Sequence, residues 1–148
     1  MKRKLKPVAL ALLFLFIAIQ FYQPARNINK EEGTMDIAQS YNIPADVKRI
    51  LHISCYNCHS SNTNYVWYNY IQPVRMMVES HIKRAREKLD FSEWSTYSNR
   101  KKERLLTSIK KQIETKEMPL PSYTLMHENA RLNEVQAKIL IDWIKSQE

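Results

Sequence analysis

Cys55-Tyr56-Asn57-Cys58-His59 is the stretch that decides how this sequence folds. It places two thiols about one helical turn apart, with an imidazole directly after the second. Thiols at this spacing can each add to one of the two vinyl groups on the edge of a haem, and the adjacent histidine is then held beneath the iron. We therefore expect one haem c, bound through thioethers at Cys55 and Cys58, with His59 as the proximal iron ligand.

Other uses of a Cys-x-x-Cys pair fit the sequence less well. The chain has two cysteines, and both lie in this motif. A disulfide between them would close too short a loop to stabilise the fold much, and a redox dithiol would need a strand–helix–strand pattern that the sequence lacks. A zinc site needs four ligands, and His81 and His127, which could complete one, lie 46 residues apart instead of at the usual short spacing.

The composition points to a single helical domain. With 148 residues and one glycine, Gly33, the chain cannot build glycine-rich phosphate loops or tight glycine hairpins. It also lacks the paired carboxylates, nucleophilic triad or nucleotide motif that another chemistry would need. We expect an all-α fold over residues 42–148.

Apolar residues that recur at spacings of three and four predict four helices in this domain. These helices are expected to begin near Pro44, Pro73, Arg100 and Asn133. The first leads directly into Cys55, and the last can open with a capping box in which Gln136 reaches back to Asn133. The motif is thus expected at the end of a helix.

The first 21 residues are predicted to be a signal peptide or a membrane anchor. A basic stretch, Lys2 to Lys6, precedes an apolar run from Val8 to Phe21 that is broken by Gln20. A run of about 14 residues suits the apolar part of a signal peptide and is short for a spanning helix, which needs roughly 20. Residues 22–41 are polar and are predicted to be a tether. The domain is expected to be exported, hence periplasmic, and tethered to the inner membrane, or soluble if the segment is cleaved.

The order of these features resembles that of small monohaem cytochromes c. More narrowly, the chain is similar to an exported haem-binding domain family common in Bacteroidetes, through Cys55-Tyr-Asn-Cys58-His59-Ser60, Tyr65-Val-Trp67-Tyr68, Pro73, His81, Phe91-Ser92-Glu93-Trp94, Glu117-Met118-Pro119-Leu120 and His127. Arg84-Ala85-Arg86 departs from the Glu-Gly-Arg expected there. The resemblance implies a small cytochrome-c-like helical domain around one covalent haem. That family has no established reaction, so it says little about what the haem does.

The sixth iron ligand is open to more than one assignment. Met118 is the leading candidate because Pro119 follows it and stops a helix there, and because the cytochrome resemblance places a Met-Pro before the last helix. His81, on the apolar face of the second helix, is the main alternative, followed by His127 or Met126. The His59 ring also needs an acceptor for its second N–H. The carbonyl of Pro73 can serve, as in small cytochromes c, or Pro73 only begins a helix.

The charge distribution bears on partners. Four of the net +8 charges lie in the N-terminal basic stretch, which leaves 8 − 4 = +4 for the rest. The remaining cations concentrate on the second and third helices, either as a solvated face or as a docking surface for an acidic redox partner. No nucleic-acid recognition motif is present.

Electron transfer is the function we expect, with Met118 and His59 closing the iron on both sides. The alternative is a haem enzyme or sensor for peroxide or a gas, with an open iron and His81 or His127 beside it. A partner domain with a structural haem is a third reading. Catalysis is the less favoured assignment. A haem propionate could accept a hydrogen bond from Trp94 or Trp67.

Overall fold

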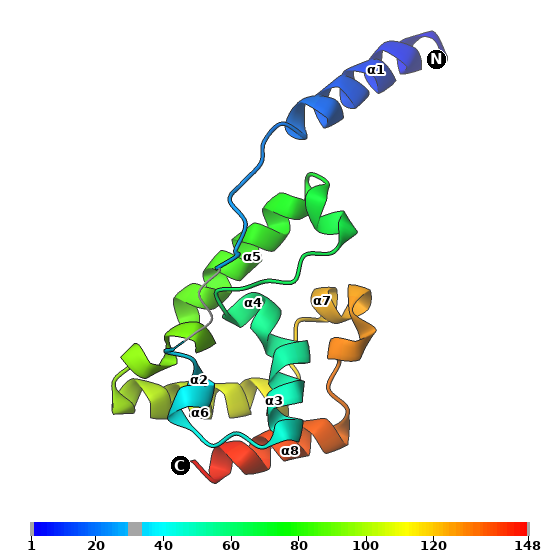
Figure 1. The fold of residues 1–148 in the computed structure, drawn as a ribbon. Coiled ribbons are helices and arrows are strands. Elements are labelled where there is room, and N and C mark those ends of the chain that lie inside the picture. The colour runs from blue at the N-terminus through cyan, green and yellow to red at the C-terminus, as the bar shows by residue number, and fades with distance from the viewer. Residues whose placement is uncertain (1, 30–33, 148) are drawn as a thin grey trace.

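The computed structural model describes residues 2–29 and 34–147, and most of these residues are helical, as predicted (Figure 1). In chain order the α-helices are α1 (Lys2–Ile19), α2 (Ile37–Ser40), α3 (Ala45–Leu51), α4 (Asn57–His59), α5 (Val74–Lys88), α6 (Asn99–Glu114), α7 (Pro121–Met126) and α8 (Glu134–Lys145). A π-helix, η1 (His52–Tyr56), joins α3 to α4, and three short 3₁₀ helices are η2 (Trp67–Tyr70), η3 (Phe91–Thr96) and η4 (Glu128–Ala130). Within the described ranges an isolated bridge between Ile28 and Asn62 is the only β pairing.

The four predicted helices of the domain are α3, α5, α6 and α8, and each begins within one residue of its predicted start. The capping box of α8 is present. The Asn133 side chain accepts from the Gln136 backbone N–H at 2.8 Å, and the Gln136 side chain accepts from the Asn133 N–H at 3.0 Å. These bonds satisfy two backbone donors that a helix start would otherwise leave unpaired.

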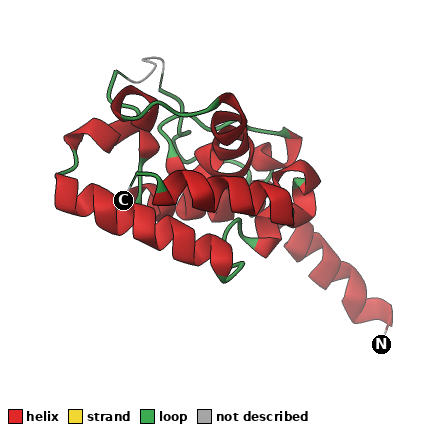
Figure 2. Ribbon diagram, turned by 90° about the horizontal axis from the view of Figure 1, so that it is seen from below, coloured by secondary structure: helices red, strands yellow, loops and turns green. Residues whose placement is uncertain are grey.

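The main core lies between α3, α6, α8 and η3. Figure 2 shows the helices of the domain packed against one another, with the N-terminal helix projecting away from them. Its fully buried members include Leu51, Phe91, Trp94, Leu106, Leu140 and Ile144. Burying each such side chain contributes about 1.5–3 kcal/mol. Cys55 and Tyr56 pack against the same cluster, so the core fixes the helix that carries the Cys-x-x-Cys-His motif.

Helix α1 stands apart from the domain (Figure 1). Its apolar side chains from Leu12 to Ile17 are all exposed, by 48% to 75%. None of the helices that the structure describes is both long enough and apolar enough to cross a membrane. The expected signal peptide or membrane anchor at residues 1–21 stays a prediction.

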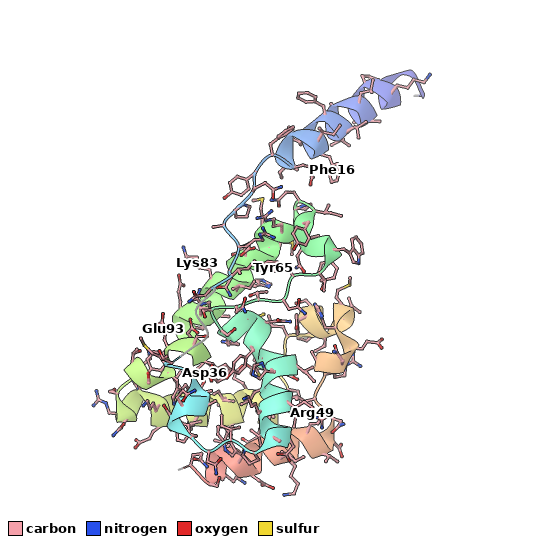
Figure 3. All side chains as sticks on the ribbon, in the orientation of Figure 1. Phe16, Asp36, Arg49, Tyr65, Lys83 and Glu93 are labelled. Carbon is pink, nitrogen blue, oxygen red and sulfur yellow. The ribbon has the colours of Figure 1, made fainter. Side chains whose placement is uncertain are left out.

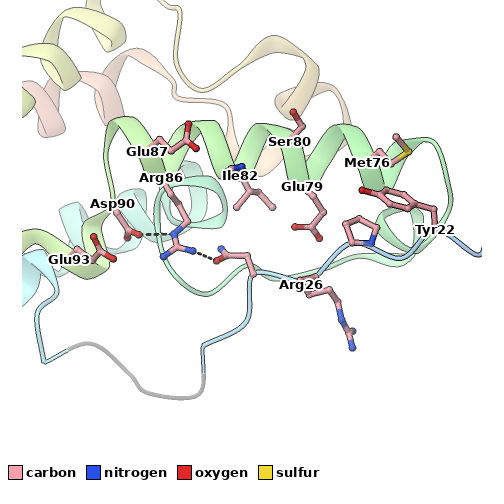
Figure 4. Close-up of a pocket in the computed structure, with 14 residues that line it drawn as sticks. Tyr22, Arg26, Met76, Glu79, Ser80, Ile82, Arg86, Glu87, Asp90 and Glu93 are labelled. Atoms are coloured by element: carbon pink, nitrogen blue, oxygen red, sulfur yellow. Dashed lines mark hydrogen bonds and ion pairs between the residues drawn. The ribbon is translucent and has the colours of Figure 1, made fainter.

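The residues predicted as a tether, 22–41, are held against the domain where the structure describes them. Residues 22–29, here called the strap, run along α5 (Figure 4). Asn27 donates to the Ser60 carbonyl and to Thr63, both at 2.8 Å, and accepts from Arg86 at 2.7 Å. Farther along, Ile37 is completely buried in the core. The polar composition predicted a tether because, in the sequence alone, side chains that bond to a distant helix cannot be distinguished from solvated ones.

Arg86 links the strap to the end of α5. Its Nε donates to the Asp90 carboxylate at 2.7 Å while its Nη1 reaches Asn27 (Figure 4). The Asp90 side chain is almost completely buried, and this ion pair and the Ser92 N–H at 2.9 Å satisfy it. An open groove of about 760 Å³ runs between the strap and α5.

Candidate functional site

The Cys-x-x-Cys-His motif lies at the end of one continuous helical run, α3 through η1 to α4. Val47, Ile50 and Leu51 bury one face of this run. Cys55 lies in the π-helix η1, and short π-helical segments within α-helices are frequent at functional sites. Both cysteines are free thiols. The structure therefore presents two reduced thiols and an imidazole along one short helix end, the geometry that the spacing predicted.

Burial keeps both thiols protonated. It raises the pKa of Cys55 to about 12, with the neighbouring Cys58 adding to the effect, and it also raises the pKa of Cys58. Dithiols that act by thiol–disulfide exchange have lowered thiol pKa values, because the thiolate is the nucleophile. The described residues also contain no group of three His, Cys, Asp or Glu side chains that could hold a metal ion. The raised pKa values of the two thiols thus argue against a redox dithiol.

His59 is oriented by the C-terminal end of α5. Its Nδ1 lies 3.0 Å from the carbonyl oxygen of Leu89, the residue that caps this helix. Because a carbonyl can only accept, Nδ1 carries the proton and Nε2 keeps its lone pair for an external ligand. Burial lowers the pKa of His59, opposed by the Leu89 and Ala85 carbonyls, so the neutral, ligating form is favoured.

The predicted acceptor for His59, the Pro73 carbonyl, is wrong. Pro73 lies at the other end of α5, where it precedes the first helical residue and accepts from the Met77 N–H at 3.3 Å. Pro73 therefore serves only to begin helix α5, which is the second of the two roles considered for it from the sequence. The Leu89 carbonyl is available because the last carbonyls of a helix have no partner within it. Because Leu89 lies 30 residues from His59, no sequence pattern predicted this hydrogen bond.

A cavity of about 260 Å³, here called the Met118 cavity, opens beside Cys55 and His59. Met118 lines it together with a mainly apolar wall that consists of Leu89, Phe91, Leu105, Ile109, Ile113, Pro119 and Leu132. Lys88, Ser108 and Gln112 supply its polar rim. The leading predicted axial pair, His59 and Met118, therefore lines one cavity.

The loop after α6 positions Met118. The helix ends in a Schellman motif, in which the Lys116 N–H bonds to the Ile113 carbonyl at 3.1 Å and the Glu117 N–H to the Gln112 carbonyl at 3.0 Å. The Met118 N–H also bonds to the Gln112 carbonyl, at 3.2 Å. Lys116 adopts the left-handed conformation that this motif requires, with φ of 57°. The chain thus reverses direction after α6, and this turn brings Met118 to the cavity beside Cys55 and His59.

A second cavity, of about 310 Å³, is here called the His81 cavity. It is lined by Cys58 and by all three alternative ligand candidates, which are His81, Met126 and His127. His127 is already engaged, because its Nε2 lies 2.5 Å from the Tyr68 hydroxyl and its ring stacks on Tyr123 at 4.3 Å. The alternatives therefore gather on the Cys58 side, away from the cavity that His59 lines.

The residues present fit a covalent haem. Cys55 borders one cavity and Cys58 the other, so a flat group bonded to both sulfurs would extend along both. Each cavity alone has a volume close to the roughly 300 Å³ at which pockets for small molecules begin. His59 would hold the iron through Nε2, and Met118 offers a thioether. The haem would supply one-electron chemistry that no side chain of the site has.

The tryptophans proposed as propionate donors do not line either cavity. Trp94 is completely buried in the core, and its Nε1 has no hydrogen-bond partner. Trp67 is 72% exposed. Tyr123 is a wall residue that the sequence reasoning missed, and its hydroxyl accepts from the Asn57 side chain at 2.7 Å within the motif itself. Its position two residues after Pro121, among the other aromatics, carried no distinguishing signal.

Comparison with known families gives one match. Residues 14–146 match the model of a family described as the haem-binding domain. No curated protein and no solved structure matches the chain significantly. The matched range contains the strap, both cavities and the Cys-x-x-Cys-His motif.

Proposed function

The chain belongs to the haem-binding domain family, and on that basis we propose that it attaches one haem covalently and serves as an exported electron-transfer protein. Cys55 and Cys58 form the thioethers, and His59 and Met118 are the axial ligands. The observation that carries this proposal is the Met118 cavity, in which an imidazole with a free Nε2 and a thioether lie beside a half-buried, reduced thiol.

Protonated thiols suit the attachment reaction. Each S–H adds across one vinyl C=C, so that a C–S bond forms at one carbon, the hydrogen goes to the other, and no oxidant is consumed. The raised thiol pKa values of Cys55 and Cys58 support this use over disulfide exchange, which needs a thiolate.

His59 is arranged as a ligand before any iron is bound. The Leu89 carbonyl holds the Nδ1 proton at 3.0 Å and fixes the ring. Such an outer partner raises the basicity of a metal-bound histidine and sets its orientation. Because the partner is a backbone atom at the end of a 15-residue helix, it resists displacement.

Met118 supports electron transfer over catalysis. A haem iron between an imidazole and a thioether has a raised potential and no open position for substrate. The Schellman loop holds Met118 at the cavity through backbone hydrogen bonds, and most of the cavity wall is apolar. His81 and His127 border the other cavity, whereas Met118 shares its cavity with His59.

Export and an acidic redox partner belong to the same proposal. The basic stretch and apolar run at the N-terminus support export. Exposed cations on α5 and α6 support docking of an acidic protein, and include Lys83, Arg84, Lys88, Arg100, Arg104 and Lys111. Lys88 is both exposed and at the rim of the Met118 cavity. Electron exchange with an acidic partner should therefore slow as ionic strength rises.

The test is the absorption spectrum of the full chain, produced together with a c-type maturation system, with and without carbon monoxide. We expect haem that stays on the chain after denaturation, and a low-spin reduced spectrum that carbon monoxide does not change. Haem that remains attached in a Cys55→Ala, Cys58→Ala variant would refute covalent attachment through these thiols.

Matched substitutions assign the sixth ligand. Met118→Leu keeps the volume and apolar character of the side chain but removes the sulfur, so it should open the iron to carbon monoxide and lower its potential. His81→Leu is the control and should leave both unchanged. The reverse pattern would transfer the ligand assignment to His81 and favour the enzyme or sensor reading.

A further inference from the structure

We propose that the domain seats one end of its surface against an anionic lipid bilayer. This end, here called the junction face, consists of Phe21, Tyr22, Trp67, Tyr70 and Ile71. Their side chains are exposed by 84%, 57%, 72%, 47% and 39%. Four of the five are aromatic. The proposal is independent of haem ligation, since none of the five lines the Met118 or the His81 cavity.

The junction face lies where α1 leaves the domain. In Figure 1, α1 departs beside the start of α5, while α6 and α8 form the opposite end of the molecule. Figure 3 shows the same arrangement in space, with Phe16 of α1 at one end of the molecule and Arg49 of α3 toward the other. The close-up in Figure 4 shows Tyr22 next to Met76, which is itself 40% exposed. The exposed apolar surface of α1 therefore continues into the junction face.

Hydrogen bonds couple α1 to this face. The Gln20 side chain accepts from the Gln72 N–H at 3.0 Å and donates to the Gln72 carbonyl at 3.3 Å. The Gln72 side chain is completely buried and donates to the Tyr22 carbonyl at 2.5 Å. Arg75 donates to the Gln23 side chain and the Pro24 carbonyl. When α1 enters an apolar medium, these bonds bring the junction face to the same surface.

The charge of both segments suits an anionic surface. Residues 1–28 carry five cations and residues 60–78 carry one, with no acidic residue in either segment. The cations are Lys2, Arg3, Lys4, Lys6, Arg26 and Arg75. Arg26 lies over the Tyr70 ring at 5.7 Å. Basic segments are attracted to anionic headgroups, and tryptophan and tyrosine are enriched at the boundary between lipid and water.

A lipid surface fits α1 better than a protein groove does. A groove covers one face of a helix, with anchors at spacings of three and four. The six consecutive residues Leu12–Ile17 of α1 are instead apolar and exposed all round. An apolar medium that surrounds the helix is the environment that buries all of them.

The experiment is hydrogen–deuterium exchange of the full, haem-loaded chain, with and without vesicles of phosphatidylcholine and phosphatidylglycerol. We expect slower exchange in two segments, residues 2–29 and the loop region 64–73, and no change in α6. Protection confined to α1 would overturn the proposal, because α1 would then bind lipid without the domain. Protection of 64–73 that appears without vesicles and grows with protein concentration would also overturn it, in favour of a second copy.

A matched pair of variants completes the test. Trp67→Ser combined with Ile71→Ser should weaken vesicle binding by about tenfold and abolish protection of residues 64–73. Val135→Ser, which changes an equally exposed apolar residue on α8 at the other end of the domain (67% exposed), should leave both unchanged. An unaltered haem spectrum in every variant establishes that the fold is retained. Equal effects of the two changes would refute a specific face.

Discussion

Lys116→Gly should stabilise the domain. Lys116 lies in the turn that precedes Met118 and adopts a left-handed backbone conformation, which favours glycine over lysine. Lys116 has φ of 57° and is exposed, and its N–H closes the Schellman motif at the Ile113 carbonyl. A side chain with a Cβ costs roughly 1–2 kcal/mol in the left-handed region. Glycine relieves this cost but gives up about 0.5–1 kcal/mol through its freer unfolded chain. The expected net gain is about 0.5–1 kcal/mol.

The assay is thermal unfolding of the haem-loaded chain, followed by circular dichroism. For a chain of this size the gain should raise Tm by about 1–4 °C. Lys116→Ala is the matched control, since it removes the same charge and side chain but keeps Cβ. Its effect should stay within about 0.5 kcal/mol of zero. If the alanine variant gained as much as the glycine variant, the side chain and not the backbone conformation would be responsible. The glycine variant should also keep the haem spectrum, because the backbone bonds that position Met118 are retained.

Three further predictions concern the frame around the site. Tyr56 donates to the Asp36 carboxylate at 2.9 Å, so Tyr56→Phe should cost about 1–2 kcal/mol at neutral pH in urea unfolding. Burial, and then Asp36, raise the pKa of Tyr56 above 10. Its contribution is therefore present below about pH 10 and is lost as the pH rises further, so the wild-type and variant stabilities should converge there; a constant difference would contradict this assignment. Asn133→Ala removes half of the capping box with Gln136 and should cost about 1 kcal/mol in urea unfolding, and an unchanged midpoint would show that the cap contributes nothing. Phe91→Ala leaves a void between the core and the Met118 cavity and should cost about 3–5 kcal/mol by the same measurement, whereas a loss below 1 kcal/mol would mean that the site collapses around it.

The sequence by itself determined the features that depend on neighbours in the chain. The two thiols and the imidazole of Cys55–His59 are chemically complete within five residues, so their spacing predicted the cofactor without knowledge of the fold. The helix starts followed from apolar periodicity, and the α8 capping box from two side chains three residues apart. Each of these signals is local, because a helix places residues three and four apart on one face.

Only the tertiary structure decided the features that depend on distant segments. The partner of His59 is a backbone carbonyl at Leu89, and a backbone atom leaves no trace in residue identity. Met118 and His81 were both plausible ligands in the sequence, and the packing of the helices put them beside different cavities. The strap lies within the predicted tether, and its contacts were not foreseen because its polar side chains find their partners on α5 and in the loop after the motif. These contacts join residues 30 or more positions apart. Sequence periodicity does not predict contacts over such separations, because the packing of the core determines which groups meet.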